Sequence, residues 1–305
     1  MNLAHLHIVL NHVPTLGSIV GAVMLIVALV KRDARLKRIS FQVLAVMALL
    51  VIPTYLSGSA AQRMLLTRSD ISQSLIEVHQ NSAMLSLILM TFTGTFAWFG
   101  LWQARRFSRA GSWTTAAVLV LSVLTAAVLL RTANLGGKVS HPEVRYEESL
   151  VEETGWRAPF SSFANDNSWV WPASETLHFI GMTLLFGVAL LVNLRMMGMM
   201  KSISFAAVHR LLPLGILGFI LNTVTGMVFF IASPELYVGN TGFVIKIALL
   251  IPAGLSVIYF TAFDQPWAVG PEKEAPLTAK IFAICVTTSL LGVMYFGRML
   301  PFLQN

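Results

Sequence analysis

Charged side chains are scarce in this chain, at 11% of its 305 residues against the roughly 25% that is typical of soluble domains. Hydrophobic residues make up 56% of it. This balance excludes an ordinary soluble enzyme and a disordered chain, because a soluble core of this size needs more polar surface to cover it. Cysteine is nearly absent as well. The single Cys285 excludes an internal disulfide, a zinc site built from cysteines and the Cys-x-x-Cys-His attachment of a c-type haem.

Apolar residues are gathered in long runs instead. A helix crosses the roughly 30 Å hydrocarbon layer of a membrane in about 20 such residues. The sequence predicts eight spans of this kind, at Leu6–Val30, Ile39–Ser59, Leu75–Trp102, Trp113–Leu130, Trp169–Leu194, Phe205–Ala232, Phe243–Phe263 and Ile281–Leu300. We therefore predict an all-α integral membrane protein whose eight transmembrane helices form two four-helix bundles.

Basic residues are distributed unevenly between the two sides of the predicted membrane. The first, third, fifth and seventh connections hold 13 of the 21 Lys and Arg residues, whereas the other side holds 8 of them and 10 of the 14 acidic residues. The positive-inside rule then predicts a multi-pass protein of the bacterial inner (cytoplasmic) membrane with both termini in the periplasm. In this setting the net charge of +7 reflects topology, and no nucleic-acid partner is expected.

The longest predicted connection divides the chain into three parts. They are a four-helix membrane domain at 1–133, a periplasmic loop at 134–168 and a second four-helix membrane domain at 169–305. The acidic stretch Glu143–Asp166 is a candidate docking surface for a partner, and its charge would equally keep the loop solvated.

The seven histidines are candidate functional residues, because ionisable groups are costly inside a membrane. His12 and His79 lie at similar depth on the first and third spans, which are diagonal in an up-down-up-down bundle. Two imidazoles facing each other across that diagonal could ligate the iron of a haem b. Ser82, Ala83 and Ser86 follow His79 on one helix face, where small side chains leave room for a porphyrin.

These residues also have structural explanations. A histidine near the end of a span can hydrogen-bond a carbonyl group or water, and small residues can serve helix packing alone. Arg131 could pair with a haem propionate or simply extend to the membrane interface. His5 and His7, which lie nearer the N-terminus, could be alternative ligands.

A second candidate site lies in the fifth predicted span. Glu175 and His178 are three residues apart and share a helix face, with His178 roughly 13 Å inside the membrane at 1.5 Å per residue. The functional interpretations are a second haem ligand at His178 or a Glu/His pair that takes protons from a quinol. The structural interpretation is a buried hydrogen bond. A carboxylate di-metal site is rejected, because Glu77 and His79 are two residues apart and point differently.

Three stretches of the first half carry a family resemblance: Leu6–Pro14, His79 and Thr132–His141. They resemble motifs of an uncharacterised family of four-helix bacterial membrane domains that are often suggested to bind haem. That family usually has an aromatic residue between its histidine and its proline, where this chain has Val13. Its last motif carries a histidine that aligns with His141. The resemblance implies a haem-binding membrane domain.

The second half is similar to another uncharacterised family of membrane domains. The similar stretches are Trp171–Gly181, which contains the Glu-x-x-His-x-x-Gly pattern, then Leu194–Arg195, Leu212–Pro213 and Gly218–Phe219. Neither family has an assigned activity, so the two resemblances support haem binding without naming a reaction.

The sequence thus predicts a haem-b membrane cytochrome. The candidate haem-binding residues are His12, His79, Arg131 and His178, and the candidate quinone and proton site consists of Glu175 and His178. The cytochrome would carry one haem, or two if His178 is also a ligand, and would exchange electrons between the quinone pool and a periplasmic or membrane redox partner. No catalytic domain is predicted, so the chain would be an electron-transfer subunit of a membrane oxidoreductase. The alternatives are a transporter, for which Pro213 and Pro252 could break two spans, and a non-redox membrane anchor.

Overall fold

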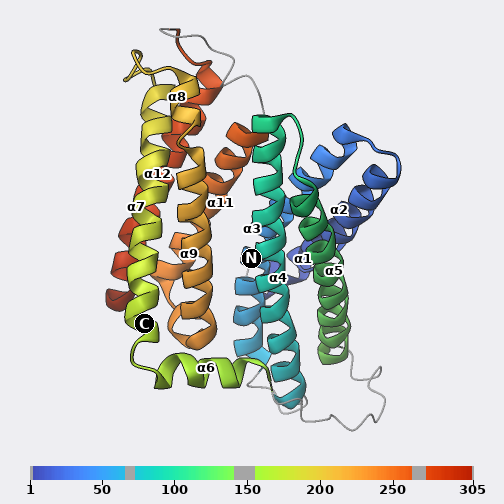
Figure 1. Cartoon of the computed structure of the whole chain (residues 1–305). Helices are drawn as coiled ribbons and strands as arrows, with labels where there is room; N and C mark the ends of the chain where they lie inside the picture. Colours follow the sequence, from blue (N-terminus) through green and yellow to red (C-terminus); the bar gives the residue numbers. More distant parts are fainter. Residues whose placement is uncertain (1–2, 66–72, 141–154, 263–272, 304–305) are drawn as a thin grey trace. The chain divides into compact units, whose positions relative to one another are not determined.

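The computed structural model describes residues 3–65, 73–140, 155–262 and 273–303 and is helical throughout its regular structure (Figure 1). It contains eight helices long and apolar enough to span a membrane, which confirms the predicted all-α membrane fold. The helices are α1 Leu3–Leu10, α2 His12–Val30, α3 Ala34–Leu65, α4 Gln73–Phe107, α5 Ser112–Ser140, α6 Arg157–Asp166, α7 Val170–Met196, α8 Phe205–His209, α9 Leu212–Ala232, α10 Glu235–Val238, α11 Thr241–Ala262 and α12 Leu277–Met299.

The chain folds as two compact units, Met1–Phe160 and Ser161–Asn305. The boundary falls inside the connection that was predicted to separate two domains. Part of that connection is helical, however. Helix α5 continues ten residues beyond the predicted end of its span at Leu130, and α6 lies wholly within the predicted loop. The extension of α5 is stabilised by apolar packing, because Leu135 and Val139 contact Leu75 and Ile76 of α4.

In unit 1, the long helices α2 to α5 form a closed four-helix bundle. Helix α2 packs against α3 and α5, and α4 packs against the same two helices. The first and third spans are therefore diagonal, as the sequence predicts. The first span is interrupted near its start, where α1 ends at Leu10 and α2 begins at His12. Pro14 contributes to this break, because a proline lacks the N–H that would bond the Leu10 carbonyl group.

In unit 2, the closest packing runs in the order α9, α7, α12 and α11. The contact between α7 and α9 is a direct approach of two backbones at Gly181 and Gly218. A methyl group added at Gly218 would lie 2.5 Å from the Gly181 carbonyl oxygen, so only glycine fits there. Pro213 lies in the first turn of α9, and α11 continues through Pro252. The predicted span Phe205–Ala232 is therefore interrupted after His209, just before Pro213, whereas Pro252 does not break its span. The interruption lies near one end of the span and not at its middle.

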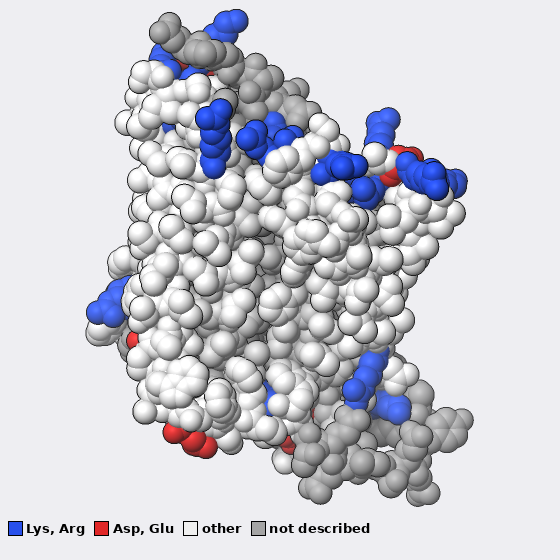
Figure 2. Space-filling view, viewed as in Figure 1, with Lys and Arg blue, Asp and Glu red and all other residues white. Residues whose placement is uncertain are grey.

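Basic side chains gather mainly at one end of each unit, beyond a broad surface that is almost free of charge (Figure 2). In unit 1 this end is formed by the α2–α3 and α4–α5 connections, and in unit 2 by the end of α7 and the start of α12. We call it the basic end of each unit. The location of the basic ends on the cytoplasmic side, and of the termini in the periplasm, stays a prediction from the positive-inside rule.

Candidate functional site: histidines at the end of unit 1

His12 does not occupy the interior of the bundle. It is the first residue of α2, and its side chain is exposed on the surface of unit 1. The structure therefore does not bring the expected pair, His12 and His79, together. The histidine that approaches His79 is His7, which lies five residues earlier on α1. Their imidazoles are near enough to interact electrostatically.

The His7 ring is held by helix α3, against which α1 packs. Its Nδ1 atom lies 3.0 Å from the Thr54 carbonyl oxygen and 3.4 Å from the Ser57 hydroxyl oxygen. The ring lies directly over Gly58, where an added methyl group would be 2.8 Å from the ring carbon Cε1. A side chain at position 58 would displace the imidazole.

The His79 ring is held by helix α5 in a very similar way. Its Nδ1 atom lies 3.1 Å from the Thr132 carbonyl oxygen. The ring lies against Gly136, where an added methyl group would be 3.1 Å from Cε1. Both histidines thus use a Thr-x-x-x-Gly segment of the neighbouring helix, Thr54 to Gly58 and Thr132 to Gly136. In each case the threonine carbonyl group receives the imidazole N–H and the glycine provides room for the ring.

These contacts define the tautomer of each neutral imidazole. A backbone carbonyl oxygen can only accept, so Nδ1 must carry the proton and donate it. The second ring nitrogen, Nε2, then carries a lone pair. No further hydrogen bond of His7 or His79 is found within the described residues. An imidazole oriented by an Nδ1–H bond to a carbonyl group, with its Nε2 lone pair available, is the usual form of a histidine metal ligand.

The small residues that follow His79 do not leave open space along α4. Ser82 and Ser86 are buried, and their hydroxyl oxygens lie 2.7 and 2.9 Å from the Thr132 hydroxyl oxygen on α5. This face therefore packs directly against α5. The Ser–Thr hydrogen bonds fix the position of the same Thr132 whose carbonyl group orients His79.

The remaining candidates of the first half are Arg131, His141 and His5. Arg131 is exposed on α5. His141 and the side chain of His5 lie outside the described residues. Among the residues that the structure does describe, no group of three or more His, Cys, Asp or Glu side chains could hold a metal ion. Within this described part of unit 1, a metal ion would therefore depend on the two histidines His7 and His79.

In unit 2, His178 does not pair with Glu175. The Glu175 side chain is exposed, whereas the Nδ1 atom of His178 lies 2.8 Å from the Thr225 hydroxyl oxygen on α9. That hydroxyl group donates its own proton to the Leu221 carbonyl oxygen at 2.6 Å, so it must accept from His178. The Nε2 atom of His178 again keeps its lone pair. The ring also contacts Phe229 edge-on, with 5.7 Å between ring centroids.

Lys246 belongs to the same region and was missed in the sequence. It lies within the apolar span Thr241–Thr261 of α11, with its side chain near Gly297 of α12. It interacts electrostatically with His178. The signal for it was present, because a lone lysine inside a span of apolar residues is itself a candidate functional residue.

Comparison of the chain with models of known protein families, with curated proteins and with solved structures found no match. The family resemblances noted in the sequence therefore stay predictions.

Proposed function

We propose that unit 1 binds one haem b through His7 and His79, and that the protein is a membrane cytochrome that exchanges electrons between the quinone pool and a redox partner. One observation carries the proposal. Two neighbouring imidazoles at one end of a membrane bundle are both oriented by Nδ1–H bonds to carbonyl groups, so that both Nε2 lone pairs remain for an axial ligand bond.

The residues around the two histidines have defined tasks in this proposal. The carbonyl groups of Thr54 and Thr132 hold the two rings in one orientation and increase the basicity of Nε2. Gly58 and Gly136 let the rings lie close to α3 and α5. When bound, haem b supplies a one-electron iron couple, whose potential depends on its axial ligands and on burial. The chain has no Cys-x-x-Cys-His motif for covalent attachment, so the haem would be held by ligation and packing.

Unit 2 supports the quinone part of the proposal. The Nε2 lone pair of His178 can accept the proton of a quinol hydroxyl group, because Nδ1–H is already bonded to Thr225. Phe229 stacks on Trp171 with 5.1 Å between ring centroids, which provides an aromatic surface beside His178 for a quinone ring. The exposed Glu175 is not part of this proposed proton transfer.

The experiment compares three single variants of the purified full-length protein: His7→Ala, His79→Ala and His12→Ala. We expect the wild type to show a b-type reduced-minus-oxidised spectrum and a low-spin bis-histidine signal in electron paramagnetic resonance. The first two variants should lose that signal. His12→Ala is the matched control and should keep it, because His12 is exposed on the surface of unit 1.

Two further outcomes test the assignment. Loss of haem in His12→Ala but not in His7→Ala would return the ligand to the position expected from the sequence. His7→Gly separates ligation from folding, because added imidazole should restore the low-spin signal if only the ligand is missing. Restoration would not occur if the variant were misfolded.

The second candidate function, a transporter, is favoured by one observation. Lys246, His178 and Thr225 form a polar cluster within the membrane-spanning part of unit 2, where ionisable groups often mark a proton or substrate path. The spectrum discriminates between the two functions. A purified wild-type protein without any b-type band would exclude the cytochrome and leave the transporter as the better hypothesis.

A further inference from the structure

A fully buried cation lies at the basic end of unit 2. Arg195, in the last turn of α7, has no exposed surface. Its guanidinium group lies 3.9 Å from the centre of the Phe205 ring. Its Nε atom donates to the Ile203 carbonyl oxygen, and Nη2 lies 3.5 Å from the Lys273 carbonyl oxygen. The remaining nitrogen, Nη1, is buried without a hydrogen-bond partner in the part of the chain that the structure describes.

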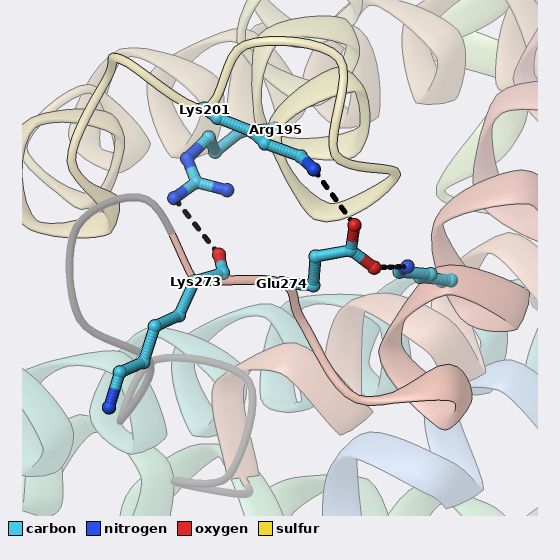
Figure 3. A network of polar contacts seen from close by, with 5 residues as sticks. Arg195, Lys201, Lys273 and Glu274 are labelled. Carbon is cyan, nitrogen blue, oxygen red and sulfur yellow. Dashed lines mark hydrogen bonds and ion pairs between the residues drawn. The ribbon is translucent and has the colours of Figure 1, made fainter.

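The acidic side chain of the residue that follows Lys273 is already engaged elsewhere. Glu274 lies 2.8 Å from Lys201 and 2.5 Å from Lys280 (Figure 3). These two ammonium groups lower the pKa of Glu274 to about 2. The side chain of Lys273 points away from Arg195 in the same view, and only its carbonyl group faces the arginine. Within the described residues, therefore, no carboxylate neutralises Arg195.

Arg195 also lines a cavity of about 280 Å³. The other lining residues are apolar and come from the end of α7, the following connection, α8 and the start of α9; they include Leu191, Ile203, Val208 and Leu211. The volume is close to the lower end of the roughly 300–1,000 Å³ of small-molecule pockets. A buried cation without a counter-charge among the described residues is costly. The cavity lies directly beside it, so a small shift of the cavity wall would bring an anion into contact with the guanidinium group.

We propose that this cavity binds the anionic headgroup of a membrane phospholipid, with the phosphate group on Arg195 and the adjoining part of the lipid against the apolar wall. An arginine is suited to this task, because its planar donors match phosphate oxygens. The apolar wall favours a lipid over a free anion in water. The position also fits, because basic pockets between helices at the end of a membrane span are places where anionic headgroups bind. This inference is independent of the proposed haem site.

The test is native mass spectrometry of the full-length protein in detergent, titrated with phosphatidylglycerol or phosphatidylcholine. We expect the wild type to bind the anionic lipid roughly tenfold more tightly, as one additional charge-assisted contact would give. Arg195→Gln should abolish this preference. Lys201→Gln is the matched control and should keep it, because Lys201 is exposed and bonded to Glu274 outside the cavity.

A second variant keeps the test decisive if Arg195→Gln fails to fold. Ala207→Phe places a bulky side chain in the cavity from α8 without touching the hydrogen bonds of Arg195, and it should weaken binding of the anionic lipid to a similar extent. Equal binding of the two lipids by the wild type, or an unchanged preference in both cavity variants, would overturn the proposal. Displacement of phosphatidylglycerol by inorganic phosphate alone would assign the site to a free anion and overturn the lipid assignment.

Discussion

Three of the histidines in the membrane-spanning helices have a contact that makes their position tolerable. His7, His79 and His178 all donate Nδ1–H to an oxygen atom of a neighbouring helix. The recurrence of this contact makes the three rings rigid, since the ring plane is held by a hydrogen bond and by packing. Rigid imidazoles with one available nitrogen are suited to ligation or proton transfer. Glu175, by contrast, is exposed, and its carboxylate interacts electrostatically with a residue other than His178.

That residue is Tyr237 of α10, and the pKa of its phenol can be used to test the interaction. Burial raises the pKa of the Tyr237 phenol, and the carboxylates of Glu175 and Glu235 raise it further. We expect Glu175→Gln to lower this pKa toward its usual value of about 10. The measurement is the phenolate absorbance during an alkaline titration, with Tyr237→Phe identifying the signal. Glu77→Gln, which removes an exposed carboxylate of unit 1, is the control and should leave the titration unchanged.

The same shift predicts the direction of a stability change with pH. A pKa that is higher in the folded state means that folding favours the neutral phenol. Its contribution to stability is fully present below pH about 10 and is lost as the pH rises through the folded pKa. A Tyr237 titration that is identical in the wild type and Glu175→Gln would mean that the Glu175 carboxylate does not act on the Tyr237 phenol.

At the scale of elements, the fold depends on a few places where helices approach closely. The α7–α9 contact at Gly181 and Gly218 is the clearest of them, because it brings backbone atoms of both helices together. It also sets the register in which His178 on α7 meets Thr225 on α9. The close packing of α7 on α9 therefore positions His178 against Thr225 as well as stabilising unit 2.

We predict that Gly218→Ala destabilises unit 2, whereas Gly226→Ala in the same helix does not. A methyl group at Gly218 would lie 2.5 Å from the Gly181 carbonyl oxygen and 2.6 Å from the Leu185 nitrogen, so the helices must separate. Such overpacking costs about 1–3 kcal/mol. At Gly226 nothing lies within 4 Å of the added methyl group, and alanine favours a helix more than glycine does. Thermal unfolding of both variants in detergent checks the difference, and equal melting temperatures would contradict the close α7–α9 contact.

At the scale of the whole molecule, the protein consists of two units of four spans, each with a basic end. The histidine pair of unit 1 lies at the end opposite the α2–α3 and α4–α5 connections, since it involves the starts of α1 and α4 and the ends of α3 and α5. With basic ends in the cytoplasm, the pair would face the periplasmic side, where the proposed redox partner would meet it.

The membrane topology of the chain can be tested with reporter fusions. A reporter fused after Asn305 should have periplasmic activity, and one inserted at Asp33 in the α2–α3 connection should be cytoplasmic, because the latter segment carries a cluster of basic residues. A pair of complementary reporters, one active only in each compartment, serves as the control. If the two positions report the same compartment, the number of spans between Asp33 and Asn305 is even and not the expected seven.

The eight spans can be predicted from the amino-acid sequence, because hydropathy is a local property that any stretch of about 20 residues carries regardless of its neighbours. The histidines of this apolar chain can also be identified as candidate functional residues from the sequence. The sequence predicts the ends of the helices less well. The extension of α5 to Ser140 depends on the contact of Leu135 and Val139 with Leu75 and Ile76, which no local pattern shows.

Which of these side chains meet depends on how the helices pack. Depth in the membrane can be counted along the chain, but direction around a helix depends on its neighbours. His7 and His12 are five residues apart and would point roughly 140° apart on a continuous helix, so similar depth does not give them the same partner. The packing of α1 on α3 selects His7 and leaves His12 on the surface. The same reason explains Glu175, which shares a turn with His178 but not its contact with Thr225.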